Sequence, residues 1–275
     1  MKNDKFTFGK CVNYILLFGA ALITLFPFYL MLITSVKTKH EFASNFWVPG
    51  LNPAWKNFST AWSAVYLYVA NSFKVTFLIV AGVTLVSILA GYAFAKMRFR
   101  FKETLYVIFL AFKMIPTSLM LIPMFINVYA MRLNDTHAGV ILPTIASLSI
   151  MPVILARSFF EAIPDSIFES ARIDGATENR VLWHILIPMA KSVIGTNALF
   201  TFFSAFNAYM WPLIVLSSDE LKTIPIGLAR LTGQYGVDYG VQMAAYTLIC
   251  VPLMALIMMS MRVYVEGVTI GAVKA

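Results

Sequence analysis

Charged side chains gather in one stretch of this chain, between two long apolar segments. The stretch holds four carboxylates and two arginines, at Asp165, Glu169, Arg172, Asp174, Glu178 and Arg180. Because a charged side chain is costly inside a bilayer, this stretch must lie in water while its flanks do not. It is therefore the place where we look first for function.

The other residues that could do chemistry form no catalytic or metal-binding set. His40, His137 and His184 fall in loops without nearby ligands, and no Ser or Asp pair has a catalytic spacing within an apolar segment. Cys11 and Cys250 have no neighbouring metal ligands. The G-x-x-x-x-G-K-[ST] pattern of a phosphate-binding loop does not occur. These observations disfavour an intramembrane enzyme.

The charged stretch has the local pattern of a helix, a glycine turn and a second helix. Pro164 suits a helix start, and Ser166 and Glu169 have the spacing of a capping box, so we expect a helix from about Asp165. Asp174-Gly175 is a turn signal. Apolar residues at every fourth position predict one apolar stripe on the first helix: Ile163, Ile167 and Ala171.

The composition is that of an integral membrane protein. The chain has 275 residues, of which 60% are hydrophobic and 12% charged, and its mean hydropathy is +0.78. Soluble domains carry about 25% charged residues. The net charge of +8 is spread over short loops, which indicates positive cytoplasmic loops and no nucleic-acid partner.

The apolar runs predict the fold class, an all-α membrane protein with six transmembrane helices. We expect one domain, 1–275, in which the charged stretch forms a loop at 161–191. Residues 35–72 are predicted to form an external loop with a short surface helix near 58–68, because tryptophans favour the interface. The predicted spans, each long enough for a bilayer, are 13–34, 74–95, 104–131, 138–160, 192–216 and 241–261.

The basic residues predict the orientation. The first apolar run is longer than a signal-peptide core and is expected to be retained. With both termini in the cytoplasm, thirteen Lys or Arg side chains lie inside, seven lie outside, and Lys113 lies within the membrane. This excess agrees with the positive-inside rule.

The charged stretch also resembles a known motif. Glu169-Ser-Ala-x-x-Asp-Gly-Ala176, followed by Ile-x-Ile-Pro188, is similar to the EAA loop of permease subunits in bacterial ABC importers. In that family the loop forms coupling helices that dock into a cleft of the cytoplasmic ATPase. The resemblance implies an ATPase-coupling loop made by Glu169, Ser170, Ala171, Asp174, Gly175, Ala176 and Pro188.

Other segments resemble the carbohydrate-uptake branch, the family of the maltose-transporter inner-membrane permease. Phe206-Asn-Ala-Tyr-Met-Trp-Pro212 is similar to its WN-x-x-x-WP signature, with Phe in place of the first Trp. Ser35-Val-Lys-Thr, Asn71-Ser-Phe and Leu133-Asn-Asp-Thr are weaker matches. Asn207, Tyr209 and Trp211 are candidates for the translocation pathway, although aromatic residues in a bundle more often serve packing.

The resemblance implies a permease subunit of a binding-protein-dependent importer that moves a sugar or sugar-derived substrate. Its partners would be two cytoplasmic ATPase subunits that bind ATP and Mg, a second homologous permease, an extracytoplasmic solute-binding protein and membrane lipid. The resemblance also implies that the chain lies in the cytoplasmic (inner) membrane of a bacterium. It implies that the chain is not an enzyme and binds no cofactor of its own. The alternative, an ion-coupled secondary transporter, is disfavoured because every predicted span lacks acidic residues.

Lys113 is the one ionisable side chain that falls inside a predicted span. If the third span is a straight helix, Lys113 lies about 13 Å deep, near the middle of a core about 30 Å thick. It should then face the bundle interior or a water-filled cavity. Two interpretations remain: Lys113 contacts substrate in the pathway, or its ammonium bonds a carbonyl that Pro116 frees from helix pairing.

Overall fold

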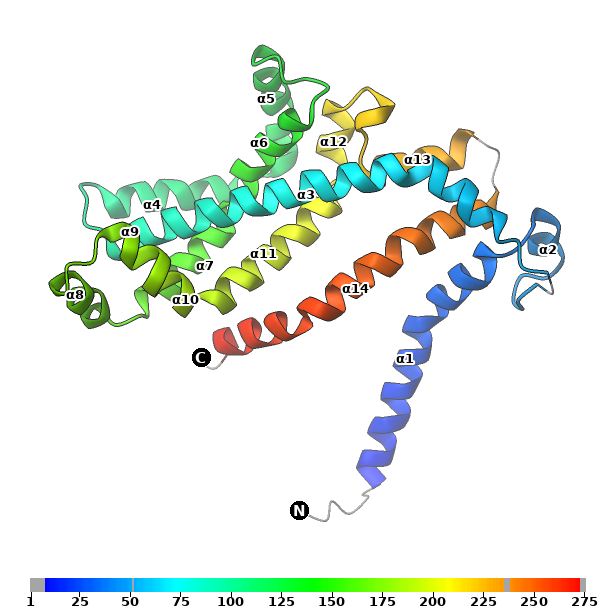
Figure 1. Ribbon diagram of the computed structural model, residues 1–275, viewed down its shortest axis with the longest axis horizontal. Coiled ribbons are helices and arrows are strands. Elements are labelled where there is room, and N and C mark those ends of the chain that lie inside the picture. The colour runs from blue at the N-terminus through cyan, green and yellow to red at the C-terminus, as the bar shows by residue number, and fades with distance from the viewer. Residues whose placement is uncertain (1–7, 51, 235–237, 273–275) are drawn as a thin grey trace. The chain divides into compact units, whose positions relative to one another are not determined.

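The computed structural model describes residues 8–50, 52–234 and 238–272 (Figure 1). All regular secondary structure in these residues is helical, which confirms the all-α class. The chain divides into two compact units, Met1–Tyr66 with Leu228–Met254 and Leu67–Gly227 with Ala255–Ala275. The expectation of a single domain stays a prediction, and both chain ends, whose cytoplasmic location was predicted, lie outside the described residues.

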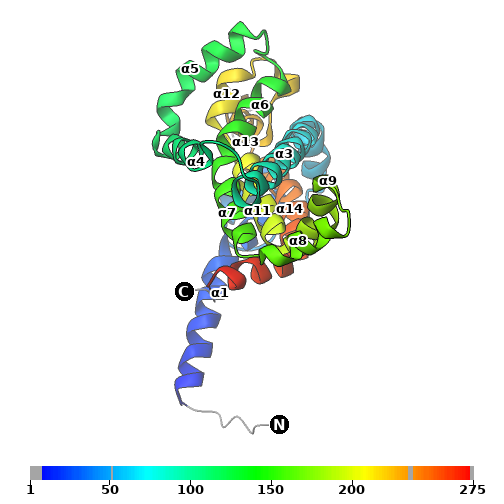
Figure 2. The same cartoon turned by 90° about the vertical axis from the view of Figure 1, so that its left-hand side faces the viewer.

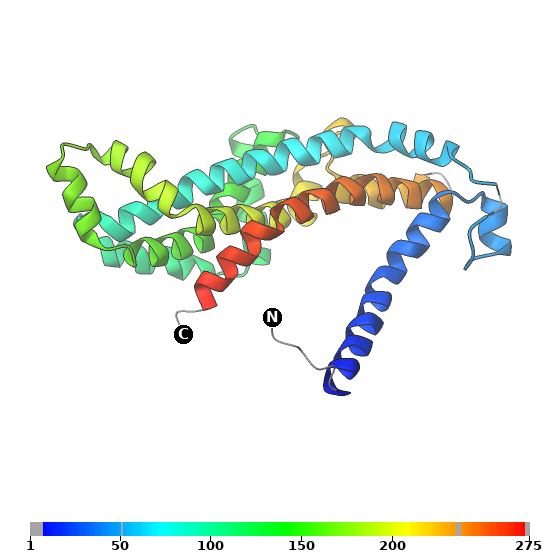
Figure 3. The same ribbon diagram turned by 60° about the horizontal axis from the view of Figure 1, so that its bottom comes forward.

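The first unit contains α1 (Phe8–Ser35), α2 (Lys39–Ser44) and the first parts of α3 (Lys56–Lys96) and α14 (Tyr239–Ala272). The apolar window of α1 is 0% buried within the chain, as expected for a lipid-facing helix. Figure 3 shows α2 beside the start of α14, where Phe42 stacks on Tyr239 at 4.5 Å between ring centroids.

The link between α1 and α2 is held by polar contacts. Thr38 and Glu41 form a reciprocal capping box at the start of α2. Lys37 is fully buried, and its Nζ donates to the carbonyls of Asn45 at 2.7 Å and Phe46 at 2.9 Å. Its ammonium is therefore satisfied by backbone oxygens.

One helix replaces the second part of the predicted external loop, from Lys56, together with the predicted second span. The sequence predicted a surface helix at 58–68 separate from a span at 74–95, whereas α3 runs without interruption over both. No Gly or Pro occurs between Lys56 and Gly82, so nothing in the backbone ends the helix. Trp62 lies inside α3, so it does not mark the end of a helix.

After its part of α3, the second unit continues with a sharp bend. Helices α4 (Lys102–Ala111) and α5 (Thr117–Ala130) are joined through the 3₁₀-helix η1 (Phe112–Met114), and the two arms meet at 103° (Figure 2). Pro116 explains the break because it has no N–H to donate and restricts the residue before it. The predicted third span is therefore not one straight helix. Lys113 comes before the bend, and its depth in a membrane stays a prediction.

The chain then forms a series of shorter helices. The elements are α6 (His137–Leu148), α7 (Ile150–Glu161), α8 (Asp165–Ile173), α9 (Glu178–Val181), the π-helix η2 (Leu182–Leu186), α10 (Ile187–Met189), α11 (Lys191–Phe206), α12 (Met210–Val215), the 3₁₀-helix η3 (Asp219–Leu221) and α13 (Ile224–Gln234). The stretch predicted as a span at 192–216 is thus broken after Phe206. The Asn207 side chain explains this end, because its Nδ2 donates back to the Phe203 carbonyl at 2.9 Å.

Six spans are the upper count that length and composition allow in the described residues. Three single helices qualify: Val12–Ser35, Lys56–Lys96 and Tyr239–Met261. Three bent pairs qualify together: Lys102–Met114 with Thr117–Ala130, His137–Leu148 with Ile150–Glu161, and Glu178–Met189 with Lys191–Phe206. The count of six therefore requires each bent pair to be one span, and it stays a prediction.

Two apolar clusters form the core of the second unit. One lies around Val83, Val140 and Trp211, and the other around Phe160, Phe168 and Leu186. Next to the second cluster, a Cβ placed on Gly91 would lie only 2.7 Å from the Cβ of Ala156. Glycine therefore allows α3 and α7 to approach closely there.

Candidate functional site

The charged stretch forms a helix, a glycine turn and a second helix, as predicted. Helix α8 begins at Asp165, but its N-cap is Pro164 and no side chain caps it. The predicted capping box of Ser166 and Glu169 is wrong, because both residues lie inside the helix. Pro164 occupies the capping position two residues earlier than the pattern suggested.

The predicted apolar stripe packs against the second core cluster. Ile163 is buried, and Ile167 and Ala171 are partly buried against the same cluster. Phe168, which the four-residue spacing missed, is the most buried side chain of α8 at 1% exposure. One face of α8 is thereby fixed to the body of the unit.

The turn between α8 and α9 needs glycine. Gly175 has φ +83°, a left-handed conformation that other residues rarely adopt, and nothing lies within 4 Å of where its Cβ would be. The Ala176 N–H donates to the Ala171 carbonyl at 2.9 Å and closes the end of α8. The requirement at Gly175 is therefore conformational and not steric.

The opposite face of the loop is open. Glu169, Ser170 and Asp174 are exposed, and Ile173 is 85% exposed, which is unusual for a large apolar side chain. Sequence reasoning missed Ile173, although a helical wheel places it on the side opposite Ala171, among charged residues. This face combines carboxylates with one apolar residue and has no covering segment in the described part of the chain.

The second half of the loop is distorted where proline follows. Pro188 lies in α10, directly after the π-helix η2. In a regular α-helix its ring would clash with the carbonyl of His184, four residues earlier. The wider turn of a π-helix relieves that clash, so Pro188 affects the shape of the loop.

Two carboxylates of the loop are held in the charged state. The pKa of Asp165 is lowered by the hydrogen bond and charge of Lys96. The pKa of Glu178 is lowered by its hydrogen bond from Arg172, and then by that from Tyr92. Both groups therefore stay ionised at neutral pH.

Lys113 lies at the bend between α4 and α5, and its side chain is exposed. It lines a cavity of 440 Å³ together with the hydroxyl residues Thr117 and Ser147 and the apolar residues Phe109 and Met120. No ion pair or hydrogen bond of its ammonium is found among the described residues.

The structure does not bring the four pathway candidates into one cavity. Asn207 and Tyr209 lie at the break between α11 and α12, where both are exposed. Trp211 is only 8% exposed and packs in the first core cluster, and its Nε1 has no partner among the described residues. None of these three lines the cavity of Lys113.

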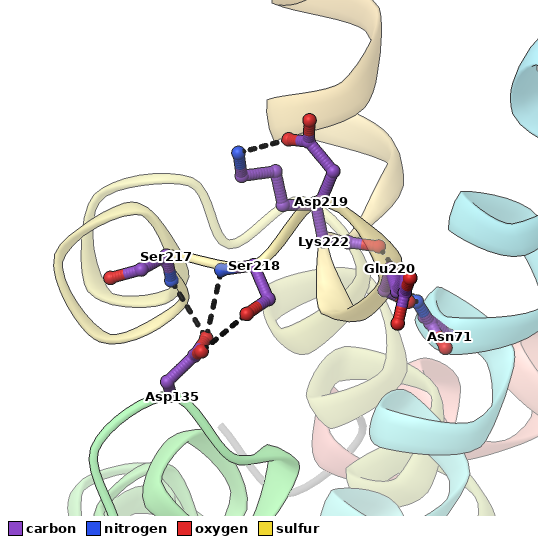
Figure 4. A network of polar contacts seen from close by, with 7 residues as sticks. All are labelled: Asn71, Asp135, Ser217, Ser218, Asp219, Glu220 and Lys222. Carbon is purple, nitrogen blue, oxygen red and sulfur yellow. Dashed lines mark hydrogen bonds and ion pairs between the residues drawn. The ribbon is translucent and has the colours of Figure 1, made fainter.

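Two of the weaker matches to the carbohydrate-uptake branch, Asn71-Ser-Phe and Leu133-Asn-Asp-Thr, lie in the second unit. Both contribute side chains to one network of polar contacts (Figure 4). The Asp135 carboxylate accepts from the backbone N–H groups of Ser217 and Ser218, each at 2.9 Å, and from the Ser218 hydroxyl at 2.5 Å. These hydrogen bonds lower the pKa of Asp135. The loop before α6 is thus joined to the segment after α12.

The start of the second unit's part of α3 is joined to the same segment. The Asn71 Nδ2 donates to the carbonyls of Glu220 at 2.7 Å and Lys222 at 3.0 Å. The buried Ser72 Oγ accepts from the Ile224 N–H at 2.8 Å. Residues 217–224 are therefore fixed from two sides.

The family of the chain follows from comparison with known proteins. Residues 84–269, more than half of the chain, match the family described as binding-protein-dependent transport system inner membrane component. The chain belongs to this family. The prediction of a permease subunit of a binding-protein-dependent ABC importer is confirmed. Membership of the family implies a multi-pass component of the inner membrane that works with an ATPase and a binding protein.

Individual relatives cover nearly the whole permease. The lactose transport system permease protein LacG of Rhizobium radiobacter is 30% identical over 96% of both chains. The arabinooligosaccharides transport system permease protein AraQ of Halalkalibacterium halodurans is 29% identical over 92% of both. A crystal structure of a bacterial ABC transporter for import of the acidic polysaccharide alginate has the same fold, with a TM-score of 0.82 and 21% identity over 94% of this chain and 98% of that one.

We predict that Ser72→Ala lowers the free energy of unfolding by about 1–3 kcal/mol, because the buried Ile224 N–H loses its acceptor. Thermal unfolding of the purified protein measures the effect. Ser59→Ala, which removes an exposed hydroxyl of the same helix, is the control and should unfold like the unchanged protein. Equal melting temperatures for the two variants would contradict the role of Ser72.

Proposed function

We propose that this permease carries a sugar or sugar-derived substrate across the cytoplasmic membrane of a bacterium, driven by ATP hydrolysis on partner subunits. The observation that carries the proposal is its similarity, over nearly its full length, to permeases named for lactose and arabinooligosaccharides. The Asn207 to Trp211 signature supports the same substrate class. The chain is then a transport subunit without enzymatic activity or cofactor of its own.

The loop of α8 and α9 is proposed to dock into the ATPase. Its apolar face is fixed to the permease, while Glu169, Ser170, Ile173 and Asp174 are open to a partner. A buried contact of Ile173 in a cleft would remove apolar surface from water. Ala171, Ala176 and Pro188 set the shape of the loop, and Gly175 makes its turn.

The remaining partners follow from this role. Two ATPase subunits would bind ATP and Mg, a second homologous permease would complete the membrane part, and an extracytoplasmic binding protein would deliver the substrate. The proposed orientation has both termini and the α8–α9 loop in the cytoplasm, with residues 217–224 outside. The excess of basic residues on the cytoplasmic side supports it.

The translocation pathway is proposed to include Lys113, Asn207 and Tyr209. The cavity at Lys113 offers an ammonium and two hydroxyl groups beside apolar walls, a set that can bind sugar hydroxyls. The exposed Asn207 amide lies at a helix break, where backbone groups are available to a ligand. The burial of Trp211 favours its alternative interpretation as a packing residue.

Glu169→Lys and Gly175→Pro should each lower uptake about tenfold or more, corresponding to about 1.4 kcal/mol of lost coupling. Lysine reverses a charge on the docking face, and proline cannot adopt the positive φ of Gly175. Uptake and ATPase co-purification are measured beside the control Lys56→Glu, a reversal of an exposed charge on the proposed external side. Normal co-purification and normal uptake in both loop variants would rule out docking here.

The orientation predicts a labelling pattern. In a chain without native cysteines, a membrane-impermeant thiol reagent should label intact cells at Asp135→Cys or Asp219→Cys and spare Arg100→Cys or Glu178→Cys. Opened cells should label at all four positions, of which Asp135 is partly buried and the other three are exposed. Labelling of Arg100→Cys in intact cells would overturn the orientation.

Lys113→Met should leave assembly and basal ATPase activity intact while uptake falls about fivefold or more, the low end of functional coupling effects. The change keeps the length of the side chain and removes its ammonium. Lys74→Met, at another exposed lysine, is the control. Unchanged uptake kinetics would reject the pathway role, and failure to assemble would favour a structural role at the Pro116 bend.

A further inference from the structure

The end of α3 at Lys96 carries two side chains that hold the α8–α9 loop. Tyr92 and Lys96 are four residues apart and therefore lie on the same face of the helix. Tyr92 is 4% exposed, and the Lys96 side chain is 6% exposed. Each contacts a carboxylate in the first turn of one loop helix: Asp165 in α8 and Glu178 in α9.

Lys96 holds the start of α8 through three contacts. Its Nζ lies 2.6 Å from Asp165 Oδ1 and 2.7 Å from the Ile163 carbonyl, and 5.1 Å from the centroid of the Phe168 ring. Because the ammonium is withdrawn from water, these contacts replace its hydration and fix its position. The start of α8 is thus attached to α3.

Glu178 holds the start of α9 and also closes the loop. Its carboxylate accepts the Tyr92 hydroxyl proton in one hydrogen bond and the Arg172 Nε–H in another, at 2.9 Å. Arg172 lies in the last turn of α8. One carboxylate therefore joins both loop helices to α3.

The same helix is fixed at its other end in this unit. Asn71 and Ser72 bond residues 220–224, as described above. From Ser72 to Lys96 an uninterrupted helix rises about 36 Å, which exceeds a hydrocarbon core of about 30 Å. A single helix thus bonds the loop at one end and the 217–224 segment at the other, and its length is sufficient to cross a bilayer.

We propose that residues 67–96 of α3 transmit the movement of the coupling loop to the external segment 217–224, and that Tyr92, Lys96 and Glu178 are the positioning residues for this transmission. The inference rests on the proposed docking of the loop to the ATPase. Because the helix is rigid and hydrogen-bonded at both ends, a displacement of the loop moves the external segment directly. No series of side-chain rearrangements between the two ends is needed. At the outer end, the movement would reach any subunit that contacts residues 217–224.

The test uses the complete importer in proteoliposomes, with the native cysteines replaced and Glu220→Cys as a reporter whose side chain is exposed. Trapping with MgATP and orthovanadate should change the rate at which an impermeant thiol reagent labels this position. The combined Tyr92→Phe and Lys96→Met variant should reduce that change about fivefold or more, the scale of a coupling energy between two sites. Lys191→Met, at an exposed lysine near the loop, is the control and should leave it unchanged.

A second reporter measures the inner attachment. Spin labels at the exposed positions Met97 and Ser166 should keep one narrow distance distribution in the free and trapped states, and the combined variant should broaden it. If the combined variant does not assemble, Tyr92→Phe alone removes only a hydroxyl group and gives the same test. An unaltered labelling change in assembled variants, or no change at Glu220→Cys in the unsubstituted importer, overturns the transmission.

The two proposals fail in different ways. If Glu169→Lys abolishes ATPase coupling while the Tyr92 and Lys96 variants behave like the control, docking stands and the transmission through α3 falls. If Glu169→Lys and Gly175→Pro both leave coupling intact, the loop is not the docking site. Rescue of the labelling change by restoring Tyr92 alone would identify the Glu178 contact as the stronger attachment and support the proposal.

Discussion

The cost of placing charge in hydrocarbon organises this permease. Ionic groups must remain in water or be fully paired, so a charged loop between apolar helices has to be held at the membrane surface by contacts that satisfy its own charges. Here the pairs of Lys96 with Asp165 and of Arg172 with Glu178 serve both needs. They pair two of the four carboxylates of the loop and attach it to the end of α3, and they leave its other face available to a partner.

Long and broken helices have complementary tasks in this arrangement. Helix α3 has no break over 41 residues and is bonded at both ends of its part in the second unit. The segments at Pro116 and Asn207 are broken, and both breaks place an exposed polar side chain, Lys113 or Asn207, at the end of a helix. Continuous helix suits the transfer of movement, and interrupted helix suits contact with a solute. The proposed positioning residues Tyr92 and Lys96 lie in the continuous helix α3, and the proposed pathway residues Lys113 and Asn207 lie at the breaks.

The sequence predicted what local chemistry determines. The start of α8 after Pro164 and the turn at Gly175 depend on neighbouring residues, and both were predicted correctly. The capping box failed because proline had already taken the capping position. The continuity of α3 was missed because interfacial tryptophans were read as a boundary, although no residue there ends a helix.

Long-range partners could not be predicted in the same way. Tyr92 meets Glu178 across 86 residues of sequence, and Lys96 meets Asp165 across 69. The sequence of one segment does not predict its partner in the other, because these contacts depend on how the helices pack, as α3 packs against α7 at Gly91. The bend that follows Lys113 was missed for a related reason, because an angle of 103° cannot be predicted from hydropathy even where proline predicts a break.

The central claim is that the open face of α8 contacts the ATPase, and site-specific photocrosslinking tests it most directly. A photoreactive amino acid at Ile173 should crosslink to the ATPase subunit in the assembled importer, and one at Phe77, exposed on α3, should not. Crosslinking at Ile173 should disappear when the ATPase is stripped from the membrane and return when it is added back. An intact, transport-competent importer with no crosslink at Ile173 would contradict the account.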